Sequence, residues 1–228
     1  IVNGVVEGAT LVSGGNIVLK RGMQGMDRGM LQAEGNITAK FLENCKVRCK
    51  GMLKADAILH SDVECQENVD ILGKKGLING GSLSTYADVH ATTLGSTMGA
   101  STKIKIISDK ELIIRANEIK EEVENKEETL RKIDEVVNRV KGQLASNQEV
   151  LPEQMNYLKQ ATVNKPLLVK QIRELREERE KLLVRIEKNK HSCIRVEGAV
   201  YSGIDITVKD VSKIQHEQVS HCRFVIDG

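Results

Sequence analysis

Aromatic residues are scarce in this sequence. Its 228 residues include two Phe, three Tyr and no Trp, so aromatics make up 2% of the chain. Proteins that bind single-stranded nucleic acid stack the bases on aromatic side chains, and this sequence lacks the residues for such a platform. The 40% hydrophobic content comes mostly from Val, Ile, Leu, Ala and Cys, which suit stacked strands and packed helices rather than a core of large rings.

An excess of charge of one sign is also missing. Lys and Arg number 34 against 32 Asp and Glu, the formal net charge is +2, and no long segment departs far from balance. Nucleic acids and anionic membranes bind clustered positive charge, so we expect neither as a partner. No apolar run approaches the ~20 residues of a membrane-spanning helix, and the first residues do not form a signal peptide.

Cysteines are too few for a secreted disulfide framework. There are five, an odd number spread along the chain, whereas such frameworks are denser and usually even-numbered. This usage indicates a reducing cytoplasm. Because the chain opens at Ile1 within strand-like sequence, we expect it to be part of a longer protein.

Composition divides the chain into three segments. Residues 1–108 are rich in Gly and β-branched residues and contain no Pro, residues 109–192 are rich in Glu, Lys, Arg and Leu, and residues 193–228 return to the first composition. We predict β-helix coils over 1–108, a coiled-coil hairpin inserted at 109–192, and resumed β-helix coils over 193–228.

The first segment repeats itself. Residues 31–39 align with 47–55 and 63–71 at an offset of 16, and with 11–19 at an offset of 20, while Val89 restarts the pattern. Each unit is apolar at alternate positions around a central Gly or Glu, which predicts a strand, a tight turn and a second strand. A repeat this short indicates a solenoid whose coils bury their inner faces together. The predicted fold is therefore mainly β, a single-stranded, right-handed parallel β-helix.

Small residues and asparagines recur in this repeat. Cys49 and Cys65 are equivalent positions, so we expect both to be buried, unmodified and stacked in the interior. Asn16 and Asn36 share another position, with Asn68 one residue out of alignment, and they predict a ladder of side-chain amides in turns that tolerate left-handed conformations.

The middle segment has the pattern of an antiparallel helical hairpin. Ser108–Glu111 forms a capping box that starts a helix, and the tip falls near residues 145–155. Seam positions spaced alternately by three and four residues predict a coiled coil. In the first arm they are Ala116, Ile119, Val123, Lys126, Leu130, Ile133, Val137, Val140 and Leu144, and in the second Leu168, Ile172, Leu175, Arg179, Leu182 and Ile186. The predicted register pairs Ile119 with Ile186, Val123 with Leu182 and Val137 with Leu168.

Three features interrupt this seam. Lys126 is predicted to face Arg179 in a basic layer that fixes the register, with a partner-binding charge site as the alternative. Gly142 and Pro166 lie at nearly the same height, so we expect a kink or break there and a short tip helix starting at Leu151–Pro152.

The solenoid resumes after the hairpin. Val196–Ala199 repeats Val6–Ala9 letter for letter, which indicates that the hairpin is an insertion between coils. Such an insertion is not needed to complete the β core. We therefore expect the hairpin, and its more polar tip above all, to contact a protein partner or a second copy.

Motifs for chemistry are weak throughout. His191, Cys193, His216, His221 and Cys222 lack the spacing of a zinc site, and no nucleophile elbow is present, so we expect no catalytic residue, metal or other cofactor.

A glycine-rich stretch leaves one alternative open. The residues from Gly73 to Gly81, with Lys74 and Lys75, are similar to a phosphate loop without the Walker pattern or a following helix. We favour a turn between coils. The alternative is a sugar- or nucleotide-binding enzyme domain that uses this loop.

A set of motifs in order resembles the flagellar assembly protein A family. They are Lys40-Phe-Leu-Glu-Asn-Cys45 with Gly35-Asn-Ile37 before it, then Ile58-Leu-His-Ser61, Gly73-Lys-Lys-Gly-Leu-Ile-Asn-Gly-Gly81 and Leu94-Gly-Ser96. The family motif usually reads Lys-Phe-Ile-Glu-Asn-Ala, so Leu42 and Cys45 are mild departures. The resemblance covers roughly 1–108 and 193–228, and members of the family also contain an inserted helical hairpin.

This resemblance implies a bacterial cytoplasmic protein with a β-helix and without established catalytic activity. It implies a non-enzymatic scaffold, with a role in flagellar assembly or its regulation through protein–protein contacts. The family-motif residues, which we interpret as a structural corner of the coil with a contact surface as the alternative, are Lys40, Phe41, Glu43, Asn44, Gly80 and Gly81.

Overall fold

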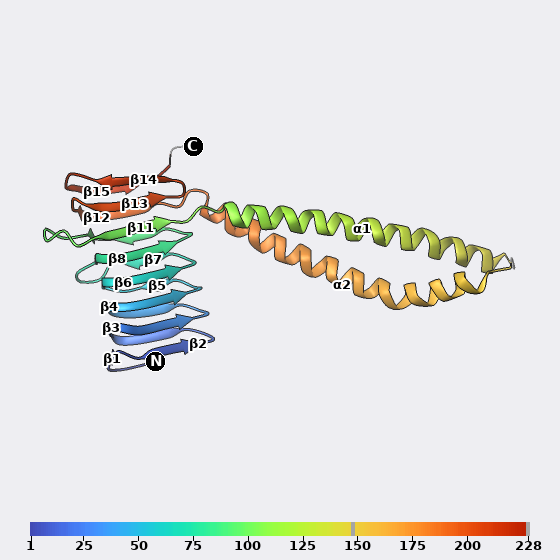
Figure 1. Ribbon diagram of the computed structural model, residues 1–228, viewed down its shortest axis with the longest axis horizontal. Helices are drawn as coiled ribbons and strands as arrows, with labels where there is room; N and C mark the ends of the chain where they lie inside the picture. Colours follow the sequence, from blue (N-terminus) through green and yellow to red (C-terminus); the bar gives the residue numbers. More distant parts are fainter. Residues whose placement is uncertain (147–148, 227–228) are drawn as a thin grey trace. The chain divides into compact units, whose positions relative to one another are not determined.

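A computed structural model describes residues 1–146 and 149–226 of the chain (Figure 1). The chain divides into two compact units. The first comprises Ile1–Asp109 and Lys188–Gly228, and the second Lys110–Glu187.

The first unit is a β-solenoid whose short strands stack coil upon coil (Figure 1). Ahead of the helices the strands are β1 (Val5–Glu7), β2 (Thr10–Ser13), β3 (Ile17–Ala33), β4 (Ile37–Cys49), β5 (Leu53–Lys54), β6 (Ala57–Cys65), β7 (Val69–Ile71), β8 (Leu77–Thr85), β9 (Val89–Ala91), β10 (Thr93–Leu94) and β11 (Thr102–Ile106). After them come β12 (Ile194–Val200), β13 (Ile204–Val208), β14 (Val211–Gln215) and β15 (Val219–Phe224).

Strand pairing confirms the predicted parallel solenoid. Leu31 lies beside Val47, and Val47 beside Val63, in parallel strands, as the offset of 16 predicts. These side chains point inward and are at most 1% exposed. Coils equivalent in sequence therefore place like residues in one buried column, and alternate residues face out. The full column is Leu11, Leu31, Val47, Val63, Leu83, Ile104 and Ile206. The right-handed sense of the coil stays a prediction.

The asparagine ladder exists, but it joins side chains to the main chain. The Asn36 amide N–H donates to Asn16 Oδ1 at 2.8 Å, and the Met52 N–H donates to Asn36 Oδ1 at 2.8 Å. The predicted ladder of side-chain amides is therefore present at Asn16 and Asn36, but neither residue has the left-handed conformation expected for these turns. Asn68 occupies the same repeat position as Asn36 and Met52, not the next one as expected. The Asn68 carbonyl accepts from Leu53 N–H, just as the Met52 carbonyl accepts from Ile37 N–H one coil earlier.

The solenoid resumes after the helices and is then capped. β12 pairs in parallel with β9 and β10, and β13 with β11. β14 and β15 instead turn back and pair antiparallel with β13 and β12, so residues 194–224 form one further coil and an antiparallel cap. The matching letters at Val6 and Val196 are not structurally equivalent, because Val196 lies beside Ala91 whereas Val6 shares its column with Val200.

The second unit is an antiparallel helical hairpin, α1 (Lys110–Ala145) and α2 (Pro152–Asn189) (Figure 1). Seven of the predicted seam residues pack together as expected, whereas Leu144 is 41% exposed. Ile119, Val123 and Ile172 are buried together, and Leu130, Leu168, Leu175 and Leu182 pack against them.

The predicted register of the hairpin is wrong. Lys126 does not face Arg179: its Nζ donates to Gln171 Oε1 at 3.3 Å, whereas Arg179 Nε donates to the Ala116 carbonyl at 3.2 Å. The partner of Lys126 therefore lies about two helical turns nearer the tip, a shift of one heptad. Two further contacts between the arms, Arg115–Glu178 and Lys165–Asp134, are displaced in the same direction, whereas the Arg176–Glu127 pair lies closer to the predicted register.

Pro166 does not break its helix. α2 runs without interruption from Pro152 to Asn189, so the predicted separate tip helix is absent from the described residues. Gly142 likewise lies inside α1. A proline within a helix removes one backbone donor but can be accommodated where neighbouring turns and packing hold the backbone.

Candidate functional site

The family motif lies within β4, around a left-handed backbone position that we call the left-handed corner. Phe41 lies beside Gly22 of the preceding coil, where an added Cβ would come within 2.6 Å of the Phe41 ring. Leu42 points inward and is fully buried, and Asn44 adopts a left-handed backbone with φ of 47°. The exposed Lys40 contributes a backbone carbonyl that accepts from Asp56 N–H at 2.9 Å.

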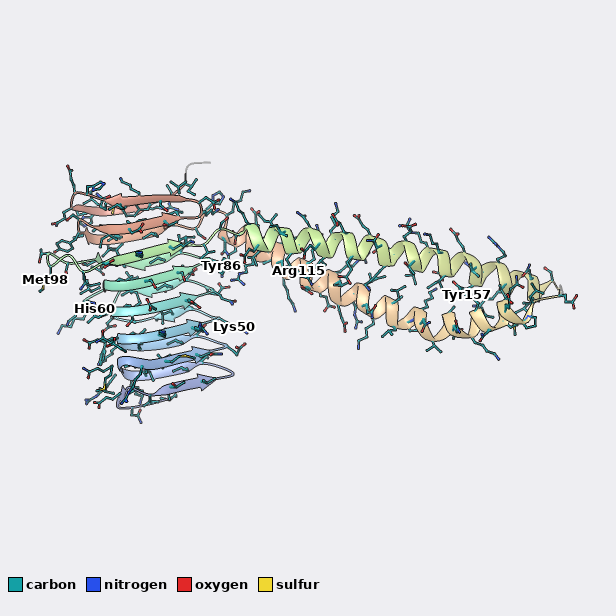
Figure 2. The ribbon with its side chains drawn as sticks, in the orientation of Figure 1. Lys50, His60, Tyr86, Met98, Arg115 and Tyr157 are labelled. Carbon is teal, nitrogen blue, oxygen red and sulfur yellow. The ribbon has the colours of Figure 1, made fainter. Side chains whose placement is uncertain are left out.

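The left-handed corner recurs in the next two coils. His60, one coil beyond Asn44, has φ of 47°, and Gly80, two coils beyond Asn44, has φ of 76°. Residues in this conformation are mostly Asn, Asp, His or Gly, because other side chains clash with the backbone there. The structure therefore brings Asn44 and Gly80 of the motif together along one edge of the solenoid. The side chain of His60 lies at the same edge and is exposed (Figure 2).

The residues that follow this corner point into the solenoid. Ser61 Oγ accepts from Cys45 N–H at 3.2 Å and donates to the Leu59 carbonyl at 2.8 Å. Gly81, with φ of 85°, approaches so closely that a Cβ would lie 2.2 Å from the Ser61 carbonyl oxygen. Sequence reasoning missed Ser61, although its position 16 residues after Cys45 marked it as the next member of that column.

The amides of Gly80 and Gly81 are not available to a phosphate group. Gly80 N–H donates to Thr102 Oγ1 at 2.8 Å, and Gly81 N–H donates to the Ser101 carbonyl at 3.0 Å. A phosphate cradle needs such amides unpaired and usually a helix N-terminus after them. Here Gly80 and Gly81 lie within β8. Gly73 lies close to Asp56, so that a Cβ added at this position would lie 1.9 Å from Asp56 Oδ1.

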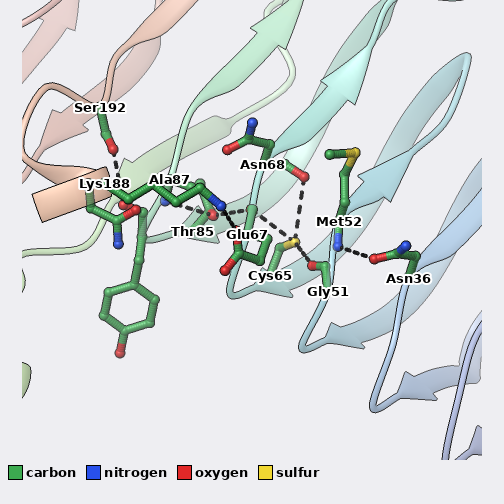
Figure 3. Close-up of polar contacts among 12 residues, drawn as sticks. Asn36, Gly51, Met52, Cys65, Glu67, Asn68, Thr85, Ala87, Lys188 and Ser192 are labelled. Carbon is green, nitrogen blue, oxygen red and sulfur yellow. Dashed lines mark hydrogen bonds and ion pairs between the residues drawn. The ribbon is translucent and has the colours of Figure 1, made fainter. Parts of the chain in front are cut away.

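Cys49 and Cys65 stack as predicted, each 3% exposed and neither disulfide-bonded. Their thiols are also hydrogen-bond donors, a role that the sequence did not suggest. Cys65 Sγ lies within hydrogen-bonding distance of the carbonyls of Gly51 (3.1 Å) and Glu67 (3.2 Å), so its single S–H can donate to the turn of its own coil or to that of the coil before (Figure 3). Cys49 repeats this with Gly51 and Gly35. Thr85, the next member of the column, donates to the Glu67 carbonyl at 2.6 Å.

The two stacked thiols differ in acidity. The hydrogen bond with Cys65 lowers the pKa of Cys49, whereas the same bond, together with burial, raises the pKa of Cys65. Cys65 therefore stays a thiol and keeps its donor role. The pair holds turn carbonyls, which is a structural task.

Surface grooves on the hairpin were also missed by sequence reasoning. One of about 430 Å³ lies between α1 and α2, with Leu130, Val169 and Ile172 among its lining residues. Its outer residues are arginines at positions flanking the seam, the places where a coiled coil contacts other helices. At the tip the exposed apolar side chains are Leu151, Met155, Tyr157 and Val163, and Figure 2 labels Tyr157.

Neither a metal-binding cluster nor a membrane-spanning helix is found in the described residues. Within 1–146 and 149–226, no group of three or more His, Cys, Asp and Glu side chains is arranged to hold a metal ion. Neither helix of the described chain is long and apolar enough to cross a membrane.

Comparison with known proteins gives one match. The family model of the flagellar assembly protein A beta solenoid domain matches residues 1–228, the whole chain. No curated protein and no solved structure matches the chain.

Proposed function

The chain belongs to the flagellar assembly protein A β-solenoid family, and from this premise we propose that it is a cytoplasmic, non-enzymatic scaffold that acts in flagellar assembly or its regulation through protein–protein contacts. The solenoid is the rigid body of this scaffold, and the hairpin is its interaction arm. The family-motif residues belong to the body, where they shape the corner of each coil.

The observation that carries the proposal is the continuity of the solenoid across the insertion. Val89 before the helices lies beside Ile194 after them, and Ile104 lies beside Ile206. The coil after the hairpin thus stacks directly on the coil before it. The hairpin residues Lys110–Glu187 add nothing to these columns, so a role other than completing the core must account for them.

The surface of the hairpin supports an interaction role. Apolar side chains that a self-contained hairpin would bury are exposed along it. Val163 is 73% exposed, Leu167 57% and Val184 64%. Isolated exposed apolar residues are ordinary, but a series of them on one long helical arm is typical of a protein-binding surface.

Affinity capture tests this proposal. The full chain and a variant in which a short Gly linker replaces Lys110–Glu187 would be used as baits in a lysate of a flagellated bacterium, with circular dichroism confirming that both are folded. We expect flagellar assembly components among the proteins captured by the full chain and absent from the deletion variant. Capture of the same set by both baits contradicts the role of the hairpin.

A ligand screen tests the competing enzyme interpretation. Thermal unfolding would be followed with nucleotides and sugars, using the full chain and a Lys74→Ala/Lys75→Ala variant. We expect no shift in the melting temperature, because the amides of Gly80 and Gly81 are already hydrogen-bonded. A stabilisation of several degrees that the double substitution abolishes would overturn the scaffold proposal.

A further inference from the structure

One flank of the hairpin carries a groove with an arginine rim. Leu130, Val169 and Ile172 form its apolar floor, in a volume of about 430 Å³. Its rim carries Arg131, Arg173 and Arg176. Glu127 also lines the groove and is ion-paired with Arg176, and Arg173 is ion-paired with Glu177 of its own helix at 3.8 Å. With three arginines and one glutamate, the groove lining still carries more positive than negative charge. We call this surface the arginine-rimmed groove.

A complementary surface lies farther along α2. Val184 is 64% exposed, and Glu177, Glu180 and Lys181 line a shallow depression with it. This surface is complementary to the arginine-rimmed groove. The exposed Val184 could contact the apolar floor of the groove, and the carboxylates of Glu177 and Glu180 could pair with its arginines. We call this surface the glutamate-rimmed valine.

The two surfaces occupy the same face of α2. Val169, Arg173, Arg176, Glu180 and Val184 are spaced by three or four residues, so they form one stripe along the helix. The stripe lies beside the seam rather than on it, because the seam uses Leu168, Ile172, Leu175 and Leu182. Basic charge therefore occupies the half of the stripe nearer the tip, and acidic charge the half nearer the solenoid end of the helix.

We propose that two copies of the chain dock through this stripe, α2 against α2 in antiparallel orientation. Val184 of each copy inserts into the arginine-rimmed groove of the other, next to Val169. In this register Arg173 faces Glu180 of the second copy, and Arg176 faces Glu177. A two-fold axis makes every contact twice, as in isologous dimers.

Charge determines the orientation. A parallel arrangement would put Arg173 against Arg173 and Glu180 against Glu180, whereas the antiparallel one joins opposite charges throughout. Exposed ion pairs add little affinity but set register and partner choice, while the inserted valines supply apolar contact. The inference rests on the proposed function, in which the hairpin is the interaction arm, and it names a second copy as what that arm binds.

Charge reversal in the full chain tests the dimer. Sedimentation equilibrium over a concentration series would measure the dimer dissociation constant, with circular dichroism checking helix content. We expect Val184→Glu to abolish the dimer, and Arg173→Glu or Glu180→Arg alone to weaken it about tenfold, since close like charges oppose association. The combined Arg173→Glu/Glu180→Arg variant restores the pairs with opposite polarity and should recover most of the affinity. Glu174→Arg is the matched charge-reversal control, because the Glu174 side chain is 56% exposed and lies off the stripe, so the dissociation constant should stay unchanged.

Two outcomes overturn the inference. One is a wild-type chain that remains monomeric throughout the series. The other is a dimer that Val184→Glu and the single reversals leave intact, which would put the interface elsewhere. Neither outcome bears on the proposed function, which fails only if partner capture survives removal of the hairpin.

Discussion

The solenoid and the hairpin bury apolar side chains in different ways. In the solenoid each inward residue has a neighbour above and below in the same column, and side chains such as Leu31, Ile37 and Leu53 are fully buried. The hairpin has one narrow seam, with Ile119 fully buried but Leu144 at its far end 41% exposed. Repetition gives the solenoid a continuous core, whereas the hairpin depends on a few contacts and leaves much of its surface available. The difference suggests that the body is the stable part and the arm the adaptable one.

Gly81→Ala should have the largest effect on this comparison, because it acts at a corner of the solenoid. The new Cβ would lie 2.2 Å from the Ser61 carbonyl, at a φ of 85° that side chains rarely adopt. We expect a loss of about 4 kcal/mol in the free energy of unfolding of the solenoid, measured by urea denaturation. Gly99→Ala is the control: its φ is 70° but nothing lies within 4 Å, so it should cost only about 1 kcal/mol. Equal losses for both would show that the stacking contact does not matter.

Ile119→Ala should weaken the hairpin alone. Ile119 is fully buried in the seam, and truncating such a residue costs about 3 kcal/mol. Because the solenoid columns do not include it, hydrogen exchange should accelerate within Lys110–Glu187 and stay unchanged in β3, β4 and β6. Faster exchange in those strands would mean that the two units unfold together.

A double-mutant cycle at Gly51 and Asn36 should sharpen the account of the turns. A Cβ on Gly51 would lie 2.2 Å from Asn36 Oδ1, so Gly51→Ala should cost about 2 kcal/mol by displacing that amide. Asn36→Ala removes the bond to Met52 N–H and should cost about 1 kcal/mol. The double variant should cost less than the sum, since no amide remains to be displaced. Gly14→Ala, with nothing within 4 Å, is the control. Strict additivity would contradict the contact.

Alkaline pH should weaken the solenoid through Cys45. Burial raises the pKa of this thiol from its ordinary value of 9.0. As pH rises, the Cys45 thiol therefore loses its proton in the unfolded chain before it does so in the folded chain. The contribution of the protonated thiol to folding stability is fully present below about pH 9 and is lost as pH rises through the folded-state pKa. In that window the contribution falls by about 1.4 kcal/mol per pH unit. Cys45→Ala should make stability correspondingly less dependent on pH in urea titrations from pH 8 upward. An unchanged slope would show that Cys45 does not ionise on unfolding.

Much of the solenoid could be predicted from the sequence, because residues at the same repeat position lie beside one another in neighbouring coils. The offset of 16 that joins Leu31 to Val47 fixes both strand pairing and the inward face. The hairpin seam was predictable for the same reason, but its register was not. Sliding one arm by a heptad leaves the apolar pattern unchanged, so only polar contacts such as Lys126 with Gln171 distinguish the two registers.

The antiparallel cap and the thiol hydrogen bonds were beyond the sequence for other reasons. A strand sequence has the same pattern whichever direction the strand runs, so the sequences of β14 and β15 do not tell a further coil from a cap. The thiol hydrogen bonds could not be predicted, because a small residue at position 65 fits the narrow interior whether or not a backbone carbonyl lies within reach of its side chain. Of the candidate site, Asn44 and Gly80 have the positive φ that their residue types tolerate, while the interpretation of the motif as structural rather than as a contact surface stays a prediction.

The ends of the hairpin are held close together on the solenoid side. Asn189 Nδ2 donates to Asp109 Oδ1 at 3.4 Å, and Lys188 is ion-paired with Glu67. A short Gly linker can therefore join Asp109 to Lys188 in place of the helices without straining the adjacent coils.

Thermal unfolding of that deletion variant, followed by far-ultraviolet circular dichroism, tests most directly whether the solenoid is complete without the hairpin. We predict the loss of the helical signal, a strand signal equal to that of the full chain, and one cooperative transition within a few degrees of the solenoid transition of the full chain. An unfolded or aggregated product would contradict the account, because the helices would then be part of the core that holds the coils together.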